Sequence, residues 1–253
     1  LDTKVNSDGK LLNPSARWGG ITRRMDVHDF EAANVEYIEF WLMDPFVNDS
    51  LGTSRGGDIY FNLGDISEDI LRDGRKSFEN GLPSSSNVVD VDTTIWGRVP
   101  RLQAIVNAFN NDPTSRQFQD IGYDGLSSSD EKTFFDRFLN IAQGQLNADA
   151  FASLENDPSA DDFRYFRSTY YDNNNVKITD RYKQFNNSEG NSAVTDNASL
   201  YSSQQTSLPN VEDINQDNTL SEAENYYEYE IALDPNNLIV GQNYITDIQN
   251  ATN

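Results

Sequence analysis

The chain has 253 residues and a formal net charge of −22, from 41 acidic and 19 basic residues. A phosphate-binding surface needs concentrated Lys and Arg, so this charge argues against nucleic acid, and it repels anionic lipid headgroups. The lack of cysteine excludes disulfides and Cys-ligated zinc, and one histidine leaves no room for a His-rich metal cluster. No apolar run reaches the ~20 residues that a membrane helix needs.

The first third of the chain has the pattern of strands. Residues 37–43 (YIEFWLM) alternate with period two and are largely apolar on both faces, which predicts a central strand. In residues 59–65 (IYFNLGD), Ile59, Phe61 and Leu63 share one face, which predicts a half-buried strand.

Residues 65–74 (DISEDILRDG) predict a short helix. Asp65 and Glu68 have the spacing of a capping box, and Gly74 ends the pattern. The alternative is an acidic ligand cluster of Asp65, Glu68 and Asp69, but capping explains these residues without a ligand.

The middle third changes to helical spacing. Apolar residues at i, i+3, i+4 and i+7 predict helices at 101–111 and 131–146, and a third helix is expected at 159–171, capped by Ser159. The aromatic stripes of these helices are expected to form core. Residues 186–210 carry few large apolar side chains and predict a long polar loop.

The last segment returns to strands. In residues 226–235 (YYEYEIALDP), alternate side chains from Tyr227 to Leu233 share one face, and a DPNN turn leads into 237–245. Strands at both ends with helices between them predict an α+β fold. We expect a discontinuous β-sandwich-like (jelly-roll-like) sheet domain from residues 1–92 and 205–253, a helical insertion at 93–185 and a polar loop at 186–210.

The stretch 213–224 (DINQDNTLSEAE) has the ligand spacing of an EF-hand calcium loop. Its six ligand positions hold Asp213, Asn215, Asp217, Thr219, Ser221 and Glu224. Asn218 stands where such loops usually have Gly, and it tolerates the left-handed conformation required there. No incoming helix precedes the loop, so we expect a structural Ca²⁺ ion of weak affinity, on the order of 10⁻⁴ to 10⁻³ M.

The alternative for this stretch is a metal-free turn. Ser221 and Glu224 have capping-box spacing, and Asp and Asn side chains bond their own backbone in turns. A second stretch, 120–131, places Asp120, Asp124, Gly125 and Glu131 at loop positions 1, 5, 6 and 12. Its third position, Gly122, supplies no side chain, and Ser128 with Glu131 also forms a capping box, so whether Asp120, Asp124 and Glu131 bind a second cation stays open.

Enzyme signatures are few in the sequence. There is no P-loop or GxGxxG pattern, and 41 acids offer too many carboxylate pairs to select one. His28, between Asp26 and Asp29, is explained as an ordinary surface residue. A carbohydrate-binding β-sandwich module is the alternative function, because Trp18, Trp41 and Trp96 could stack on sugars. Trp41, inside a predicted strand, is expected in the core.

Several long stretches together resemble the SprA/Sov family, giant outer-membrane proteins that form the translocon of the bacterial type IX secretion system. They are DFEAANVEYIEFWLMDPF (29–46), GGDIYFNLGDISEDILRDGRKSFENGLP (56–83), QDIGYDGL (119–126), RYKQFNNSEGNS (181–192) and LPNVEDINQDNTLSEAENYYEYEIAL (208–233). The resemblance implies a role in protein transport and gliding motility, within a very large β-barrel whose lumen passes folded substrates.

What the resemblance implies for this chain is a soluble insertion that caps or shapes the pore. Its partners would be the remainder of the translocon barrel, secreted protein substrates and accessory secretion proteins. The expected location is the extracellular side of the outer membrane, with the periplasmic side as the alternative. Millimolar external calcium would fill a weak loop there, and no catalytic residue is carried over from the family.

Overall fold

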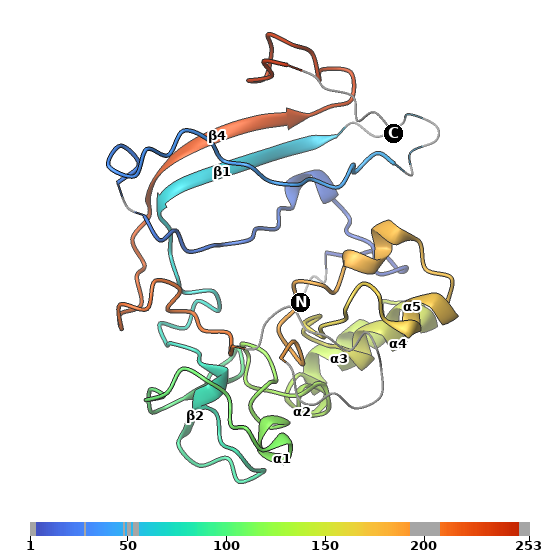
Figure 1. Cartoon of the computed structure of the whole chain (residues 1–253). Coiled ribbons are helices and arrows are strands. Elements are labelled where there is room, and N and C mark those ends of the chain that lie inside the picture. Colours follow the sequence, from blue (N-terminus) through green and yellow to red (C-terminus); the bar gives the residue numbers. More distant parts are fainter. Residues whose placement is uncertain are drawn as a thin grey trace. The chain divides into compact units, whose positions relative to one another are not determined.

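The computed structural model describes residues 4–27, 29–47, 49, 52, 56–192 and 208–247. They form an α+β structure of short helices and small antiparallel sheets (Figure 1). In chain order, with η for a 3₁₀ helix, the elements are η1 (Pro14–Ala16), β1 (Gly57–Asp65), η2 (Glu79–Gly81), β2 (Val91–Thr93), β3 (Arg98–Pro100), α1 (Pro113–Arg116), α2 (Ser128–Phe134), α3 (Asp136–Gln143), α4 (Ala148–Asn156), α5 (Thr169–Asn173), η3 (Ile178–Tyr182) and β4 (Asn225–Leu233).

The chain divides into two compact units. The first contains Leu1–Arg17 and Glu68–Leu220, and the second contains Trp18–Ser67 and Ser221–Asn253. This division differs from the expected one, because residues 68–92 lie with the helical segments rather than with the long strands. The physical reason is the buried Glu212 carboxylate, which accepts the backbone N–H groups of Ile70, Leu71 and Ser77.

The second unit is built on the antiparallel pair β1–β4. The register runs from Gly57 opposite Leu233 to Asp65 opposite Asn225. The cross-strand pairs Ile59–Ile231, Phe61–Tyr229 and Leu63–Tyr227 therefore share one face of the ribbon. Both strands, and the residues assigned to this face, are confirmed.

Residues 37–43 form no strand, so that prediction is wrong. The side chain of Phe40 packs on Phe61 of β1, with ring centroids 5.0 Å apart, but Trp41 is fully exposed and is not core. A strand with apolar side chains on both faces is stable only if other residues pack on both faces. In this unit the described residues pack on Phe40 but leave Trp41 exposed.

The region after β4 also lacks the expected strand. The DPNN turn is present, with Asp234 Oδ1 accepting the Asn236 N–H at 2.9 Å. The chain then folds back so that Asn243 bonds both the N–H and the C=O of Ala232, at 2.9 and 2.7 Å. These bonds occupy the edge of β4 where another strand would pair. The described residues form two two-stranded sheets, β1–β4 and β2–β3, so a jelly-roll-like sandwich is not confirmed.

The first unit contains the helices, the β2–β3 hairpin and a small apolar core. Its buried apolar side chains are Phe78, Leu82, Val99, Phe109, Ile121, Leu126, Leu139, Ala142 and Tyr171. An unusual number of carboxylates is buried among them: Glu68, Glu79, Asp120, Asp124, Glu131, Glu212 and Asp213. Buried charges of this kind require hydrogen bonds, protons or cations.

The predicted helices are confirmed in part. The stretch 131–146 is helical, but it is divided into α2 and α3 at Phe135, whose backbone leaves the helical region. In place of one long helix at 159–171, the chain forms only α5, capped by Ser168. The helix α4, capped by Asn147, was not predicted.

Two predicted helices do not form. In residues 65–74 the Glu68 carboxylate accepts the distant Asn215 N–H instead of capping its own turn. In residues 101–111 Phe109 is buried, but Ile105 is fully exposed, and the Val106 carbonyl accepts a bond from Asn80 Nδ2. In both stretches a group that a helix would use locally, a capping carboxylate or a backbone carbonyl, instead bonds a residue far away in the sequence. The spacing of apolar residues alone does not reveal such a bond.

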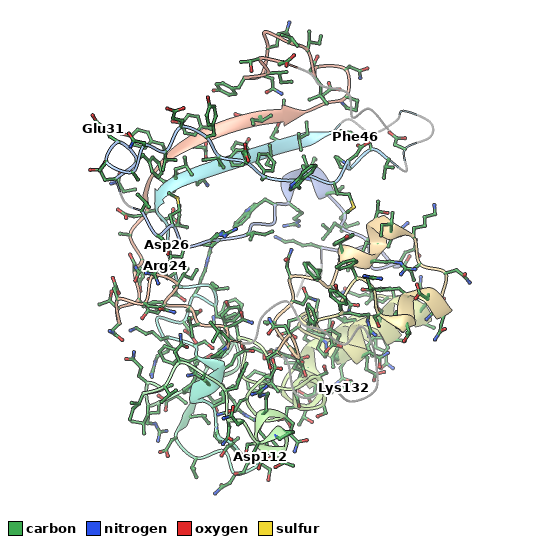
Figure 2. All side chains as sticks on the ribbon, viewed as in Figure 1. Arg24, Asp26, Glu31, Phe46, Asp112 and Lys132 are labelled. Carbon is green, nitrogen blue, oxygen red and sulfur yellow. The ribbon has the colours of Figure 1, made fainter. Side chains whose placement is uncertain are left out.

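Surface polar groups hold local turns in both units. In the first unit Asp112 caps α1 by accepting the Thr114 N–H at 2.9 Å, and in the second Arg24 pairs with Asp26 at 3.7 Å (Figure 2). No helix among the described residues combines the length and the apolar character needed to cross a bilayer.

Candidate metal centre

The predicted calcium loop begins as a compact turn in the first unit. Asp213 is buried, and its two carboxylate oxygens accept the N–H groups of Asp217 and Asn218 at 3.1 and 2.9 Å. Asp217 Oδ1 in turn accepts the Thr219 N–H and hydroxyl at 2.8 and 2.6 Å. Asn218 has a φ of +71°, so the left-handed conformation predicted for loop position 6 is present.

The six predicted ligands are divided between the two units. Asp213, Asn215, Asp217 and Thr219 belong to the first, and Ser221 and Glu224 belong to the second, where Ser221 is half-buried and Glu224 is exposed. No short helix follows them, because β4 begins at Asn225. The Lys76 ammonium lies 3.7 Å from Asp213 Oδ2, so a basic side chain already neutralises this carboxylate. Calcium binding at residues 213–224 therefore stays a prediction.

The acidic alternative at 65–69 is not assembled either. Asp65 ends β1 and is exposed, whereas Glu68 is buried against the backbone of Asn215 and Asp69 accepts the Gly74 N–H at 3.2 Å. Glu68 and Asp69 thus each bond a different backbone N–H group. His28 lies outside the described residues.

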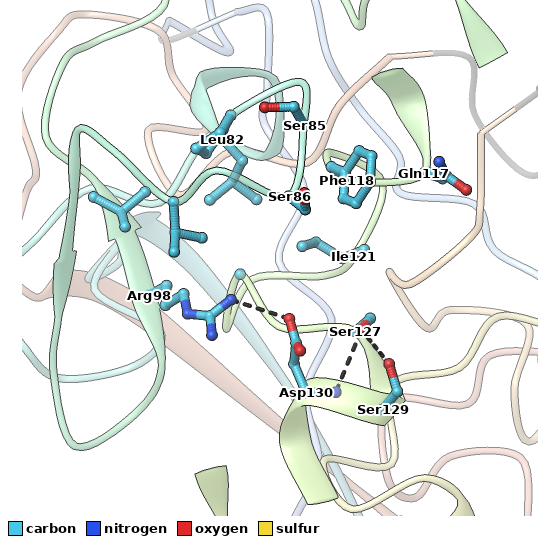
Figure 3. Close-up of a pocket in the computed structure, with 14 residues that line it drawn as sticks. Leu82, Ser85, Ser86, Arg98, Gln117, Phe118, Ile121, Ser127, Ser129 and Asp130 are labelled. Carbon is cyan, nitrogen blue, oxygen red and sulfur yellow. Dashed lines mark hydrogen bonds and ion pairs between the residues drawn. The ribbon is translucent and has the colours of Figure 1, made fainter. Parts of the chain in front are cut away.

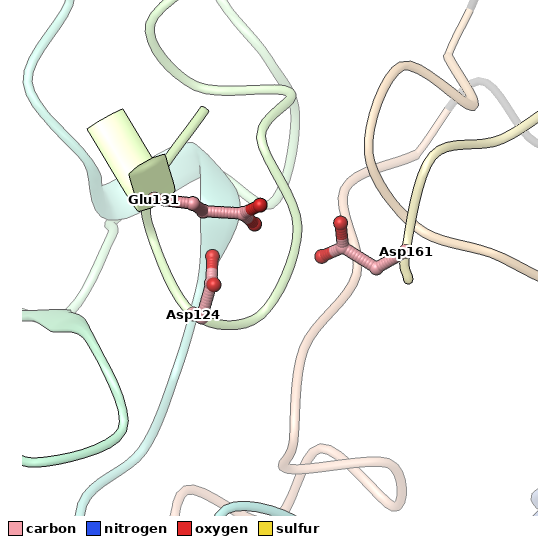
Figure 4. Close-up of side chains that lie close together, drawn as sticks. All are labelled: Asp124, Glu131 and Asp161. Carbon is pink, nitrogen blue, oxygen red and sulfur yellow. The ribbon is translucent and has the colours of Figure 1, made fainter. Parts of the chain in front are cut away.

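Among the described residues, three other carboxylates converge: Asp124, Glu131 and Asp161 (Figure 4). One oxygen of each lies within 4.8 Å of the others. Asp124 and Glu131 are buried, and Asp161 is half-buried. We call this group the acidic cluster.

Three segments of the first unit position the acidic cluster. Asp124 lies in the turn before α2, Glu131 is on α2, and Asp161 follows α4. The cap of α2 is Ser127, which accepts the Asp130 N–H, rather than the predicted box of Ser128 and Glu131. Because Ser127 caps the helix, the Glu131 side chain turns inward and is 0% exposed.

The cluster has fewer hydrogen-bond donors than oxygens. Asp124 accepts the Leu126 N–H at 3.0 Å and the Ser159 hydroxyl at 2.7 Å, and Glu131 Oε2 accepts the Ser159 N–H at 3.3 Å. No donor among the described residues reaches Glu131 Oε1 or Asp161 Oδ1, although both atoms are buried. Such orphaned oxygens are rare in folded proteins and call for an explanation.

The electrostatics of the cluster disfavour three negative charges. Burial, followed by the charge of Asp124, raises the pKa of Glu131 to about 8. Burial, followed by the charges of Asp124 and Glu131, raises the pKa of Asp161 to about 9. Burial also raises the pKa of Asp124. The ion pairs of Lys76, Arg98 and Arg181, for example, involve acids outside the cluster. A proton or an external cation would compensate the charge of the cluster.

Sequence reasoning found two of these three residues. Asp120, the third acid of the predicted second loop, instead accepts the N–H and hydroxyl of Ser192 through Oδ2. The third member of the cluster is Asp161 instead of Asp120. The local spacing could not indicate Asp161, because this residue lies 30 residues after Glu131. Gly122 is the one indirect signal: its φ is +78°, and a Cβ there would overlap Asp161 Oδ2.

A shallow pocket of about 400 Å³ lies beside this region in the first unit (Figure 3). Leu82, Phe118 and Ile121 supply apolar walls, and an ion pair of 3.0 Å between Arg98 and Asp130 borders it. The pocket contains no nucleophile paired with a base. Its charges neutralise each other, so it offers no evident catalytic chemistry.

Comparison with known proteins adds the functional class. Residues 137–253 match the family model SprA_N, which is described as a motility related/secretion protein. Over residues 137–253 the chain is thus similar to secretion- and motility-related proteins, which are not a known enzyme family. It is the SprA/Sov family that the sequence motifs resemble, and the match confirms that recognition. No match to a curated protein was found.

Proposed function

We propose that the chain is a non-enzymatic soluble insertion, a cap or pore-shaping domain, of an outer-membrane protein-secretion translocon. The observation that carries this proposal is the family match at residues 137–253. Its partners would be the remainder of the translocon barrel, secreted proteins and accessory secretion proteins. The acidic surface, with a net charge of −22, suits a domain that must stay in solution beside passing polypeptides.

An exposed apolar strip in the first unit gives this proposal a testable surface. Leu102, Ile105 and Val106 are 65%, 101% and 67% exposed. Replacing all three with Ser removes apolar surface that the fold does not bury, so the domain should fold normally. Secretion of the native cargo should fall, as measured by cargo in the culture medium. Ile178→Ser, at an exposed position elsewhere in the same unit, is the control. Undiminished secretion would argue against a role of this strip in transport.

The side of the membrane can be tested with one cysteine, because the chain has none. Ile105→Cys should react with a membrane-impermeant maleimide on intact cells if the insertion is extracellular. Ala142→Cys, fully buried, should stay unlabelled until the protein is denatured. Labelling of Ile105→Cys only after the outer membrane is permeabilised would contradict the extracellular placement and assign the periplasmic side.

We also propose that a structural Ca²⁺ ion stabilises the loop 213–224. The support is the ligand spacing and the left-handed Asn218. Ca²⁺ at 100 times its dissociation constant should add about 2.7 kcal/mol to the free energy of unfolding, by mass action. Asp217→Asn should reduce this increment, whereas Lys76→Gln, which removes the competing ammonium near Asp213, should increase the affinity. An unchanged calcium response in both variants would contradict the loop site.

Carbohydrate binding remains a second candidate function, because Trp18 and Trp41 are 87% and 102% exposed. Exposed indole rings can stack on sugar faces. A glycan array should then give binding that Trp41→Ala abolishes. Binding that is absent, or that does not depend on either Trp, would leave the translocon role as the remaining proposal.

A further inference from the structure

The acidic cluster differs from the fully buried carboxylates Glu79 and Glu212. Glu79 has a backbone N–H donor on each oxygen, from Gly122 and Asn210. Glu212 likewise accepts three backbone N–H groups. Glu131 has one donor, on Oε2, while its Oε1 faces the cluster without one and the whole side chain is 0% exposed. The fold therefore satisfies both oxygens of Glu79 and Glu212, but it leaves one oxygen of Glu131 without a donor and directed at two further acids.

We propose that Asp124, Glu131 and Asp161 form a buried Ca²⁺ site that joins α2 to the segment following α4. An ion at the centre would contact one oxygen from each carboxylate and would supply the missing partner of Glu131 Oε1. The site is independent of the loop at 213–224 and of any role in secretion.

The chemistry of the cluster favours Ca²⁺ over other common ions. Its ligand atoms are all oxygens, which Ca²⁺ and Mg²⁺ prefer, and the absence of His and Cys disfavours zinc. Ca²⁺ takes several protein carboxylates in flexible geometry, whereas Mg²⁺ usually keeps several waters and binds only one or two carboxylates. Three carboxylates whose oxygens lie within 4.8 Å of one another therefore favour Ca²⁺.

Neighbouring groups add support for an ion at this position. The Ser159 hydroxyl, 2.7 Å from Asp124 Oδ2, is a further neutral oxygen beside the cluster. Gly122 leaves open the space next to Asp161, where any side chain would overlap Oδ2 and bring its Cβ within 3.2 Å of Cγ. Glu131 on α2 and Asp161 after α4 are 30 residues apart in sequence, so one ion would fasten these two parts of the first unit together.

The test compares thermal unfolding of the 253-residue chain in chelator, in CaCl₂ and in MgCl₂. Ca²⁺ should raise the Tm of the wild type more than Mg²⁺ does. In Glu131→Gln and Asp161→Asn this rise should be largely lost, while the Tm in chelator should equal or exceed that of the wild type, because a buried ionisable group is replaced by a neutral one of the same shape. A purely structural role would instead lower the Tm in both conditions. Asp130→Asn, adjacent to Glu131 but exposed and outside the cluster, is the matched control and should keep the full rise.

Site-resolved hydrogen exchange separates this site from the loop and needs no variant. Saturating Ca²⁺ should slow exchange of the amides of Leu126 and Ser159, whose N–H groups bond Asp124 and Glu131. Unchanged exchange at 124–131 and 157–161, or a Ca²⁺-dependent rise in Tm that both cluster variants keep, would overturn the proposal. Protection confined to 213–219 would assign the calcium effect to the loop alone.

Discussion

Glu79 shows, at the scale of a single residue, how a buried carboxylate can organise a fold that has little apolar core. Its side chain is 0% exposed, and its two oxygens accept the N–H groups of Gly122 and Asn210. It thus connects η2 to two chain segments that lie more than 40 and 130 residues away. Burial raises its pKa well above the ordinary value of 4.5, and the charge of Asp120 contributes in the same direction.

Replacing Glu79 with Gln should lower the stability of the first unit. The amide NH₂ cannot accept a bond, so one buried backbone N–H loses its acceptor at a cost of about 1–3 kcal/mol. Urea unfolding measures this loss. Glu155→Gln, an exposed glutamate on α4, is the control and should unfold like the wild type.

The pH dependence of stability, compared between the wild type and Glu79→Gln, tests whether the pKa of Glu79 is raised. A carboxyl group whose pKa is raised by folding stabilises the protein fully below its unfolded value of 4.5, and this contribution is lost as pH rises toward the folded pKa. Unfolding free energy should therefore fall more steeply in the wild type than in Glu79→Gln as pH rises above the unfolded value of 4.5. Asp120, Glu189 and Tyr123, which face Glu79, titrate in both proteins. Equal slopes would contradict a raised Glu79 pKa.

The candidate sites mark the limit of sequence reasoning at this scale. Local spacing identified Asp124 and Glu131, because both lie within one twelve-residue stretch. It assigned Asp120 to the same group, since position 1 of a loop should carry a ligand, but Ser192 binds that carboxylate instead. Asp161 could not be found by spacing, because tertiary packing alone brings it to α2.

The β1–β4 ribbon is the element that sequence predicted best. Its strands have strict alternation, and the cross-strand pairs of apolar residues follow from that alternation once the register is known. The predicted helix at 101–111 failed although its spacing was equally regular, because Asn80 engages its backbone. Periodicity therefore predicts an element only where no distant polar group competes for the backbone.

Gly64 provides a test of the ribbon. Its φ is +150°, and a Cβ at this position would lie 2.7 Å from the Tyr226 Cα. Gly64→Ala should destabilise the pairing by about 1–3 kcal/mol and speed hydrogen exchange of the β4 amides. Gly57→Ala, in the same strand with no atom within 4 Å of its Cβ, should leave exchange unchanged. Similar exchange in both variants would contradict the register.

The start of α4 provides a second test among the elements. Asn147 Oδ1 accepts the Ala150 N–H, and its Nδ2 donates to Asp8, both at 2.9 Å. Asn147→Ala should cost about 0.5–2 kcal/mol through the lost cap. Asn147→Ser keeps a capping oxygen but loses the Asp8 bond, so its unfolding free energy should lie between those of the wild type and Asn147→Ala. If Ser and Ala behave alike, the cap contributes little.

At the scale of the whole molecule, the net charge of −22 means that the acidic side chains repel one another throughout the chain. Self-repulsion of this size should be relieved by salt, because the Debye length falls from about 30 Å at 0.01 M to about 3 Å at 1 M. The Tm should rise with NaCl over this range. The Tm of Asp161→Asn should still rise with NaCl, but it should lose most of its rise with CaCl₂. If the variant loses both rises in parallel, calcium acts only by screening charge.

The pairing of β1 with β4 has a consequence for how the protein is made. The start of β4 lies 160 positions after the end of β1 in the sequence, and these two strands pair only with each other among the described strands. Ribosomes add about 5–20 residues per second, so β1 emerges about 10 to 30 s before its partner exists. During that interval its backbone edge and the side chains of Ile59, Phe61 and Leu63 are uncovered. We therefore expect residues 57–65 to be a principal binding segment for the chaperones that escort the nascent chain.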